Sequence, residues 1–209
     1  MYNPEHFQKT NQSELLRFIQ TYNFATLVST DNQQLQVSHL PLLIEAENSG
    51  ANRKLLGHMA RANPHWKSLD SSEVLCIFHG PHGYISPSWY VNQLNVPTWN
   101  YAVVHVRGLV KLLRDETVLE SVLTQLVDFQ ESGFDDRWQY DLPSDFRSKL
   151  TKAIVGFEIN ISSIEGKFKL SQNRSEEDWK AALAGVEKHY GQSNPELVTL
   201  MTEEFQKKR

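Results

Sequence analysis

The fold is decided by a stretch that begins with Phe24-Ala25-Thr26-Leu27-Val28-Ser29-Thr30, turns at Asp31-Asn32-Gln33-Gln34 and resumes with Leu35-Gln36-Val37-Ser38-His39-Leu40-Pro41-Leu42-Leu43-Ile44. Both outer runs are rich in apolar and β-branched residues, and the polar run between them is typical of a turn. The stretch therefore predicts an antiparallel β-hairpin. Pro41 has no backbone N–H to donate, so it indicates an edge, a bulge or a place where another group approaches.

Similar patterns recur along the chain. We expect strands over residues 55–58, 73–78, 99–113 (interrupted by Gly108, as at a bulge), 153–161 and 167–170, with a turn at 162–166. We expect helices over residues 13–21, from Asn63-Pro64 to about 69, after the cap Asp115, and from Ser175 and Asn194 onward. Many short strands with inserted and appended helices favour a mainly β, α+β fold built on a closed or nearly closed antiparallel barrel. Because no G-x-G-x-x-G motif is present, a doubly wound nucleotide-binding fold is not expected.

Composition limits the classes of function. The chain has 209 residues, of which 40% are hydrophobic, and a formal net charge of −4. Cys76 is the only cysteine and lies in an apolar run, which excludes an intrachain disulfide and indicates a small buried residue. Neither a signal-peptide pattern nor a long apolar run is present, so we expect a cytoplasmic protein without a membrane span. The acidic balance disfavours nucleic-acid binding, and the cluster Lys207-Lys208-Arg209 is typical of a solvated helix end.

Residues 57–66 form a candidate anion site. A strand ends in Gly57-His58, Arg61 follows in the turn, and Asn63-Pro64 opens a helix. A helix N-terminus carries unsatisfied N–H groups that suit a phosphate, and an arginine can add a bidentate grip. A capped turn with a surface arginine is the alternative.

Two more segments suit a planar or anionic ligand. Residues 80–101 are rich in proline, glycine and aromatic side chains, which form either the flat wall of a ligand site or the cover of a barrel end or interface. Residues 169–174 leave a strand with two cations and three polar side chains, which suits a phosphate, a flavin edge or an ordinary connector. The histidine pairs 58/65 and 79/82 lack the spacing of a metal motif, and no G-x-S-x-G elbow occurs, so we expect no metal and assign no catalytic residue.

Several segments, in order along nearly the whole chain, match one family. They are Met1-Tyr2-x-Pro4 with Phe7, His39-Leu40-Pro41, residues 57–64, residues 84–90, Val96-Pro97-Thr98-Trp99-Asn100-Tyr101, residues 152–157 and Gly166-Lys167-Phe168-Lys169-Leu170-Ser171-Gln172-Asn173. The chain resembles the PaiB family of FMN-binding negative transcriptional regulators, within the FMN-binding split-barrel superfamily.

The resemblance implies one FMN-binding split-barrel domain over residues 1–209, with a C-terminal helical extension over about 175–209. It also implies a homodimer with FMN sites near the dimer interface. The strand around Ser38, His39, Leu40 and Pro41 would face the isoalloxazine through backbone groups, and the turn with His58, Arg61 and Asn63 would take the phosphate. Near the ring or interface would lie Thr98, Trp99 and Asn100, with Lys169 and Gln172 closing the site.

Three functions remain open. The family name implies a negative transcriptional regulator, but the acidic chain shows no helix-turn-helix pair with a basic recognition helix. Regulation would then need a DNA-binding partner or act indirectly, and direct contact through a local patch of the dimer is the alternative. The alternative is an FMN-dependent oxidoreductase of the pyridoxamine-phosphate oxidase-like or flavin reductase type. Because a flavin carries out the redox chemistry itself, such an enzyme needs no visible catalytic motif. A flavin carrier or sensor is the third.

Overall fold

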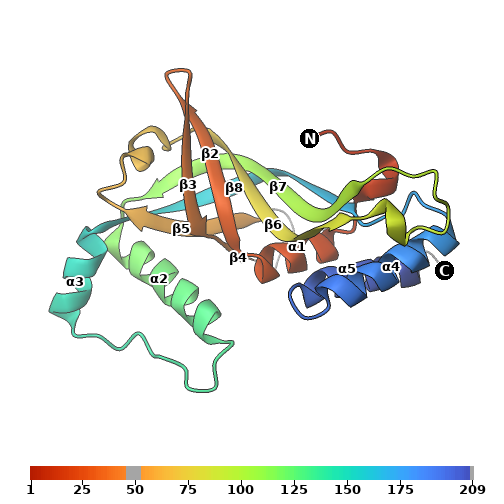
Figure 1. The fold of residues 1–209 in the computed structure, drawn as a ribbon. Helices are drawn as coiled ribbons and strands as arrows, with labels where there is room; N and C mark the ends of the chain where they lie inside the picture. Colours follow the sequence, from red (N-terminus) through yellow and green to blue (C-terminus); the bar gives the residue numbers. More distant parts are fainter. Residues whose placement is uncertain (46–52, 208–209) are drawn as a thin grey trace. The chain divides into compact units, whose positions relative to one another are not determined.

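The structure is a computed structural model that describes residues 1–45 and 53–207, so Lys208 and Arg209 of the basic cluster lie outside the described residues. The described residues form one eight-stranded sheet in the order β3-β2-β6-β7-β8-β5-β4, and β1 pairs with β8 off this path. Strands β2 to β8 are labelled in Figure 1. The strands are β1 (Gln8–Lys9), β2 (Phe24–Asp31), β3 (Gln34–Pro41), β4 (Leu43–Glu45), β5 (Lys54–Ala60), β6 (Glu73–Ile85), β7 (Thr98–Leu113) and β8 (Ile154–Lys169). The α-helices are α1 (Gln12–Thr21), α2 (Glu116–Glu131), α3 (Ser144–Lys152), α4 (Glu176–Tyr190) and α5 (Pro195–Lys207). The predicted α+β class is confirmed.

The chain divides into two compact units. Unit 1 comprises Met1–Leu15, His79–Val104 and Glu165–Arg209, and unit 2 comprises Leu16–Phe78 and His105–Ile164. Strands β6, β7 and β8 contribute residues to both.

The predicted hairpin is present in unit 2. Strands β2 and β3 pair antiparallel from Phe24↔Pro41 to Asp31↔Gln34. The connection is two residues long, and both have positive φ, 46° at Asn32 and 67° at Gln33. This is the backbone of a type I′ turn, whose twist matches that of the paired strands. Every second side chain is buried in β2 from Ala25 to Ser29, and in β3 at Ser38 and Leu40, as the period of two requires.

Helix α2 covers part of the sheet in unit 2. The Asp115 side chain accepts hydrogen bonds from the backbone N–H of Thr117 (2.8 Å) and Val118 (3.3 Å), which confirms the predicted cap. Val122 and Leu126 of this helix pack against Leu56 of β5, and those three side chains are at most 6% exposed. The predicted apolar stripe thus faces the sheet. Helix α3 was not expected, because its polar sequence has no apolar period.

Unit 1 has its own core between α4 and α5. The side chains of Trp179, Val186, Leu197 and Met201 are fully buried. Trp179 also packs edge-on against Phe205, with 5.0 Å between ring centroids. The two predicted C-terminal helices are therefore confirmed, and Ser175 caps the first by accepting from the Asp178 N–H.

Strands β7 and β8 continue through two glycines that the sequence predicted as a bulge and as part of a turn. The turn predicted at 162–166 is wrong, because β8 runs unbroken from Ile154 to Lys169. A Cβ on Gly166 would lie 2.3 Å from Leu15 Cδ2, so this glycine permits a close approach. A Cβ on Gly108 would lie 2.4 Å from the Asn160 carbonyl oxygen, and β7 continues through this position as well.

Within the described residues, no helix is long and apolar enough to cross a membrane.

Candidate functional site

The turn after β5 in unit 2 is held by Asn63. Its side-chain Oδ1 accepts from the His65 N–H (3.1 Å), and Pro64 occupies the first helical position, as expected. The helix that follows is a single 3-10 segment, Pro64–Ser68, shorter than predicted. Because Asn63 already takes one of its N-terminal N–H groups, the case for an anion site here depends on the side chains of the turn.

Arg61 ties this turn to the start of β8. Its Nε donates to the Lys152 carbonyl (2.7 Å) and its Nη2 to the Ile154 carbonyl (2.8 Å), while its own N–H donates to the Ala153 carbonyl (2.8 Å). The guanidinium also lies 5.9 Å from the Trp66 ring centroid. Arg61 thus stabilises the junction of α3 and β8, and Nη1 makes no hydrogen bond to the described residues.

A buried hydrogen-bonded chain links the turn to the hairpin. Ser29 Oγ lies 2.8 Å from His65 Nε2, and Ser38 Oγ lies 2.8 Å from His65 Nδ1. Asn63 Nδ2 then donates to Ser38 Oγ (3.0 Å). His65 is 3% exposed, and burial lowers the pKa of its imidazole, which favours the neutral form. In a neutral imidazole one ring nitrogen donates and the other accepts, and each has a serine hydroxyl as its partner.

This hydrogen-bonded chain brings two predicted site residues together. Ser38 and Asn63 are in direct contact, whereas Ser29 and His65 were not among the residues assigned to the site. The sequence signal for His65 was its position two residues after a capping asparagine. The signal for Ser29 was its place opposite Gln36, two residues from Ser38 in the hairpin register.

Strand β3 carries the other predicted residues of this group. Ser38 and Leu40 are buried, and His39 points outward, where its Nδ1 lies 3.1 Å from Thr26 Oγ1. Strand β3 lies at one end of the strand order, so one of its edges has no strand partner within the described residues, and Pro41 is its last residue. His58 lies on β5 opposite Gly156, and burial lowers its pKa.

The remaining predicted residues lie in unit 1. Lys169 Nζ donates to Thr98 Oγ1 and to the Trp99 carbonyl oxygen (3.0 Å). Asn100 is fully buried, and its Nδ2 donates to Ser171 Oγ (3.0 Å), so its side chain points into the core of this unit.

Gln172 supports the chain that leaves β8. Its Oε1 accepts from the Leu170 N–H (2.7 Å) and its Nε2 donates to the Phe168 carbonyl (2.6 Å). This amide bridges a turn in which Ser171 has a left-handed φ of 73°. Gln172 and Asn100 therefore satisfy protein groups, while Trp99 is 47% exposed and Lys169 half-buried.

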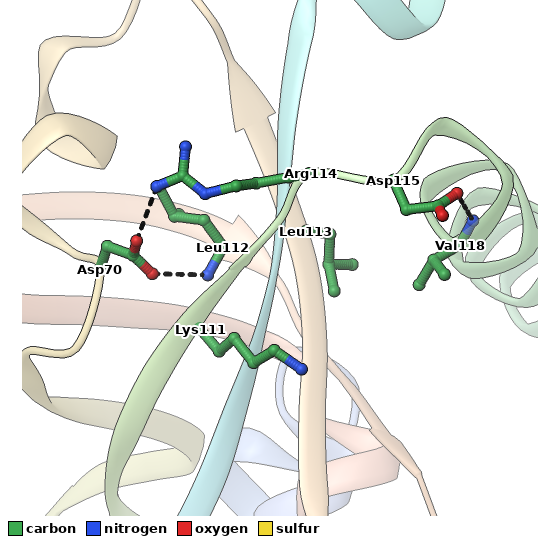
Figure 2. A pocket seen from close by; sticks show the side chains of 7 residues that line it. All are labelled: Asp70, Lys111, Leu112, Leu113, Arg114, Asp115 and Val118. Carbon is green, nitrogen blue, oxygen red and sulfur yellow. Dashed lines mark hydrogen bonds and ion pairs between the residues drawn. The ribbon is translucent and has the colours of Figure 1, made fainter.

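Unit 2 also contains a pocket that is lined by other residues. The pocket has a volume of about 380 Å³, and none of the predicted site residues lines it. Figure 2 shows the side chains that do: Asp70, Lys111, Leu112, Leu113, Arg114, Asp115 and Val118. Asp70 accepts from the Leu112 N–H (3.1 Å) and from Arg114 Nη2 (2.8 Å), and both contacts lower its pKa. Asp70 and Arg114 of the pocket are thus paired with each other.

The remaining reactive side chains are the metal-ligating types and the single cysteine. No three histidine, cysteine, aspartate or glutamate side chains gather closely enough to hold a metal in the part of the chain that the structure describes. Cys76 is fully buried, and burial raises the pKa of its thiol, which disfavours the reactive thiolate.

Comparisons with known proteins point to flavin binding. A family model described as "Putative FMN-binding domain" matches residues 1–163. The chain is 36% identical, over 99% of both sequences, to protease synthase and sporulation protein PAI 2 of Bacillus subtilis. Among solved structures it resembles the flavocytochrome Anf3 of Azotobacter vinelandii (TM-score 0.59, 16% identity, 78% of this chain and 69% of that one). It also resembles the FAD and heme binding protein of Mycobacterium smegmatis (TM-score 0.59, 13% identity, 78% and 73%).

Proposed function

We propose that this chain, which belongs to the FMN-binding domain family and carries FMN as its cofactor, is a homodimeric negative regulator of transcription. The expected resemblance to PaiB is confirmed by the family match and by the 36% identity to the Bacillus subtilis protein. That identity covers 99% of both chains, and it is the observation that carries the proposal, together with the relative's name, which links that protein to sporulation. We also propose a cytoplasmic location and a single domain over residues 1–209.

The residues of unit 2 fit a flavin phosphate and ring. Asn63 and Ser38 place an amide and a hydroxyl side by side, and Arg61 retains Nη1 as a charged donor for a phosphate oxygen. The free edge of β3 offers backbone N–H and C=O groups of the kind that pair with the polar edge of a flavin ring. FMN supplies the redox chemistry when bound, and these residues bind and orient it.

The residues of unit 1 are proposed as a second group of FMN contacts. Thr98, Trp99 and Lys169 are joined by the hydrogen bonds of the lysine ammonium. Asn100 and Gln172 hold the backbone around them. Each group is tested by its own variants, so failure of one does not depend on the other.

The outward face of the hairpin supports the homodimer. Phe24, Leu35 and Val37 are 63%, 73% and 52% exposed, respectively. Exposed apolar side chains that gather on one face are typical of an interface. We propose that this face meets the same face of a second copy in an isologous contact.

The charge of the chain limits how the dimer would reach its target on DNA. At a net charge of −4, phosphate neutralisation contributes little, so we propose that a DNA-binding partner or a local patch brings the dimer to its target. The FMN-loaded protein should show no NAD(P)H oxidation above free FMN. Steady NAD(P)H turnover would contradict the regulator and support the FMN-dependent oxidoreductase. Target genes should be expressed more strongly in cells that lack the protein, and unchanged transcript levels would contradict a regulatory role.

A further inference from the structure

The connection between α2 and α3 is a long surface segment of unit 2. Residues 132–143 form neither helix nor strand, and every residue from 132 to 139 is exposed (Figure 1). Irregular connections of about this length are uncommon in compact domains and usually have a function of their own. We call residues 131–146 the acidic aromatic arm.

The arm exposes aromatic rings to solvent. Phe134 is 62% exposed, and Trp138 and Phe146 are each 48% exposed. The Trp138 ring packs edge-on against that of Tyr140, with 5.9 Å between their centroids. An aromatic side chain in water lacks the free energy that burial provides, so several rings exposed on one segment are typical of a contact with another protein.

Hydrogen bonds within the arm hold its backbone in place. The Glu131 carboxylate accepts from the Trp138 N–H (2.8 Å), and the Glu131 carbonyl oxygen accepts from the Phe134 N–H (3.0 Å). Arg137 Nη2 donates to the Ser132 carbonyl oxygen (3.2 Å). Because these bonds order the segment before a partner binds, docking costs less conformational entropy than it would for an unstructured loop.

The arm also carries the excess negative charge of the chain. It contains one cation, Arg137, and five carboxylates: Glu131, Asp135, Asp136, Asp141 and Asp145. Its net charge of −4 equals the formal net charge of the whole chain, so the charges outside the arm balance one another. None of the five carboxylates forms an ion pair within residues 1–45 and 53–207, although Lys149 and Lys152 follow on α3. The arm therefore combines unpaired negative charge with exposed rings.

We propose that the acidic aromatic arm docks onto a partner protein whose surface combines lysines and arginines with an apolar groove. Phe134 and Trp138 enter the groove, and Asp135 and Asp136, which lie between them in the sequence, pair with cations at its rim. Acidic segments interspersed with apolar residues are typical of protein interaction segments.

The charge of the arm disfavours other occupants. Nucleic acids and anionic lipids carry the same sign of charge and repel carboxylates. Two arms repel each other as well, which disfavours a second copy that meets the first arm to arm. The inference goes beyond the proposed function, because it depends neither on FMN nor on a regulatory role.

The test uses the full-length protein and two dye-labelled peptides of about 18 residues that contain only leucine and lysine. In the first peptide, leucine recurs every three or four residues and lines one face of a helix. The second peptide has the same composition in an order that spreads leucine around the helix. Fluorescence anisotropy measures the dissociation constant of each complex.

The variants remove the rings and the charges of the arm separately. Trp138→Ser and Phe134→Ser each remove one exposed ring, and the double variant Asp135→Asn with Asp136→Asn removes two exposed charges. All four side chains lie outside the core, and thermal unfolding identifies any variant that fails to fold.

Matched controls change the same chemistry elsewhere on the surface. Leu109→Ser removes an exposed apolar side chain from another part of unit 2. Glu187→Gln with Glu196→Gln removes two exposed carboxylates from the helices of unit 1. Neither control should change the affinity for the first peptide.

Each ring variant should weaken binding of the first peptide about 10-fold or more. The double Asn variant should weaken it about 3-fold or more and reduce its dependence on NaCl concentration. The second peptide should bind wild type less tightly than the first. Equal binding of both peptides, no binding by wild type, or folded arm variants with wild-type affinity would each overturn the inference.

Light scattering of wild type and arm variants at several concentrations tests a second copy as the occupant. The arm variants should keep the wild-type mass, and a mass that falls with loss of the rings would overturn the choice of a basic partner. No step of the test contains FMN, so the flavin titration of the proposed function succeeds or fails independently.

Discussion

His65 Nδ1 lies 2.8 Å from Ser38 Oγ, so the first residues after the β5 turn are hydrogen-bonded to the strand that we expect to face the flavin. The His65 ring has a second serine, Ser29, at its other nitrogen. The imidazole thus fixes the distance between turn and strand from inside unit 2.

Removal of this imidazole should loosen both segments. His65→Ala is expected to lower the free energy of unfolding by about 1–3 kcal/mol, because Ser29 and Ser38 would lose a buried partner. It should also weaken FMN binding, since Asn63 and Ser38 would no longer be held together. Urea unfolding and FMN titration measure the two effects, with the exposed His6→Ala as the control. If the variant kept the wild-type unfolding free energy and FMN affinity, the proposed role of this hydrogen-bonded chain would be excluded.

Buried His65 and half-buried His58 should make stability depend on pH. Burial lowers the folded-state pKa of His65 and His58 below 6.5, so the unfolded chain takes up protons first as the pH falls. The contribution of these residues is therefore present above pH 6.5 and is lost progressively below it. Urea unfolding between pH 7.5 and about 5 should show this decline, above the range where carboxylates titrate. A folded His65→Gln variant should show a shallower decline, and an identical slope would contradict the assignment.

Arg61 should affect both binding and stability. Arg61→Ala is expected to weaken FMN binding by about 1.5–3 kcal/mol if Nη1 donates a charged hydrogen bond to the phosphate. It should also lower the unfolding temperature, because the carbonyls of Lys152 and Ile154 lose their donor. Riboflavin, which lacks the phosphate, should bind folded wild type and variant with similar affinity. Arg107→Ala removes an exposed arginine of unit 2 as a control. Unchanged FMN affinity would remove Arg61 from the site.

The hairpin face should control the oligomeric state. Val37→Glu places a charge on an exposed apolar position of β3 and should shift a dimer toward monomer, because the charge would be buried at the contact. Leu109→Glu, at a residue that is 51% exposed elsewhere in unit 2, should leave the dimer intact. Light scattering after size-exclusion chromatography gives the mass of each. If both variants keep the wild-type mass, the contact lies elsewhere.

Gly108 should be intolerant of any side chain. Gly108→Ala would place a methyl group 2.4 Å from the Asn160 carbonyl oxygen, so we expect a loss of about 1–3 kcal/mol of unfolding free energy. Gly133→Ala is the matched control, because a Cβ there meets no atom within 4 Å. Equal unfolding free energies for the two variants would contradict the close approach of β7 and β8.

Local signals were sufficient for much of the fold. The hairpin, the Asp115 and Ser175 caps and the C-terminal helices follow from side-chain period and capping chemistry, which act within a few residues. The unbroken β8 did not follow, because Gly166 is required by Leu15, which lies far away in the sequence. Helix α3 lacked an apolar period.

The candidate site was predicted less fully than the fold. The family motifs pointed to Ser38 and Asn63, which the structure places in contact, and capping chemistry identified Asn63. The motifs gave no reason to connect Ser29 with Ser38, because His65, which joins the two serines, lies 36 residues from Ser29 along the chain. The burial of Asn100 with Ser171 likewise depends on contacts between distant strands and turns.

Titration of the purified, flavin-stripped protein with FMN tests the central claim most directly. Quenching of flavin fluorescence should be saturable, with about one FMN bound per chain, and the loaded protein should have the mass of a dimer. No binding at micromolar FMN would contradict the account of the site, and the chain would then share the fold of its family without its cofactor.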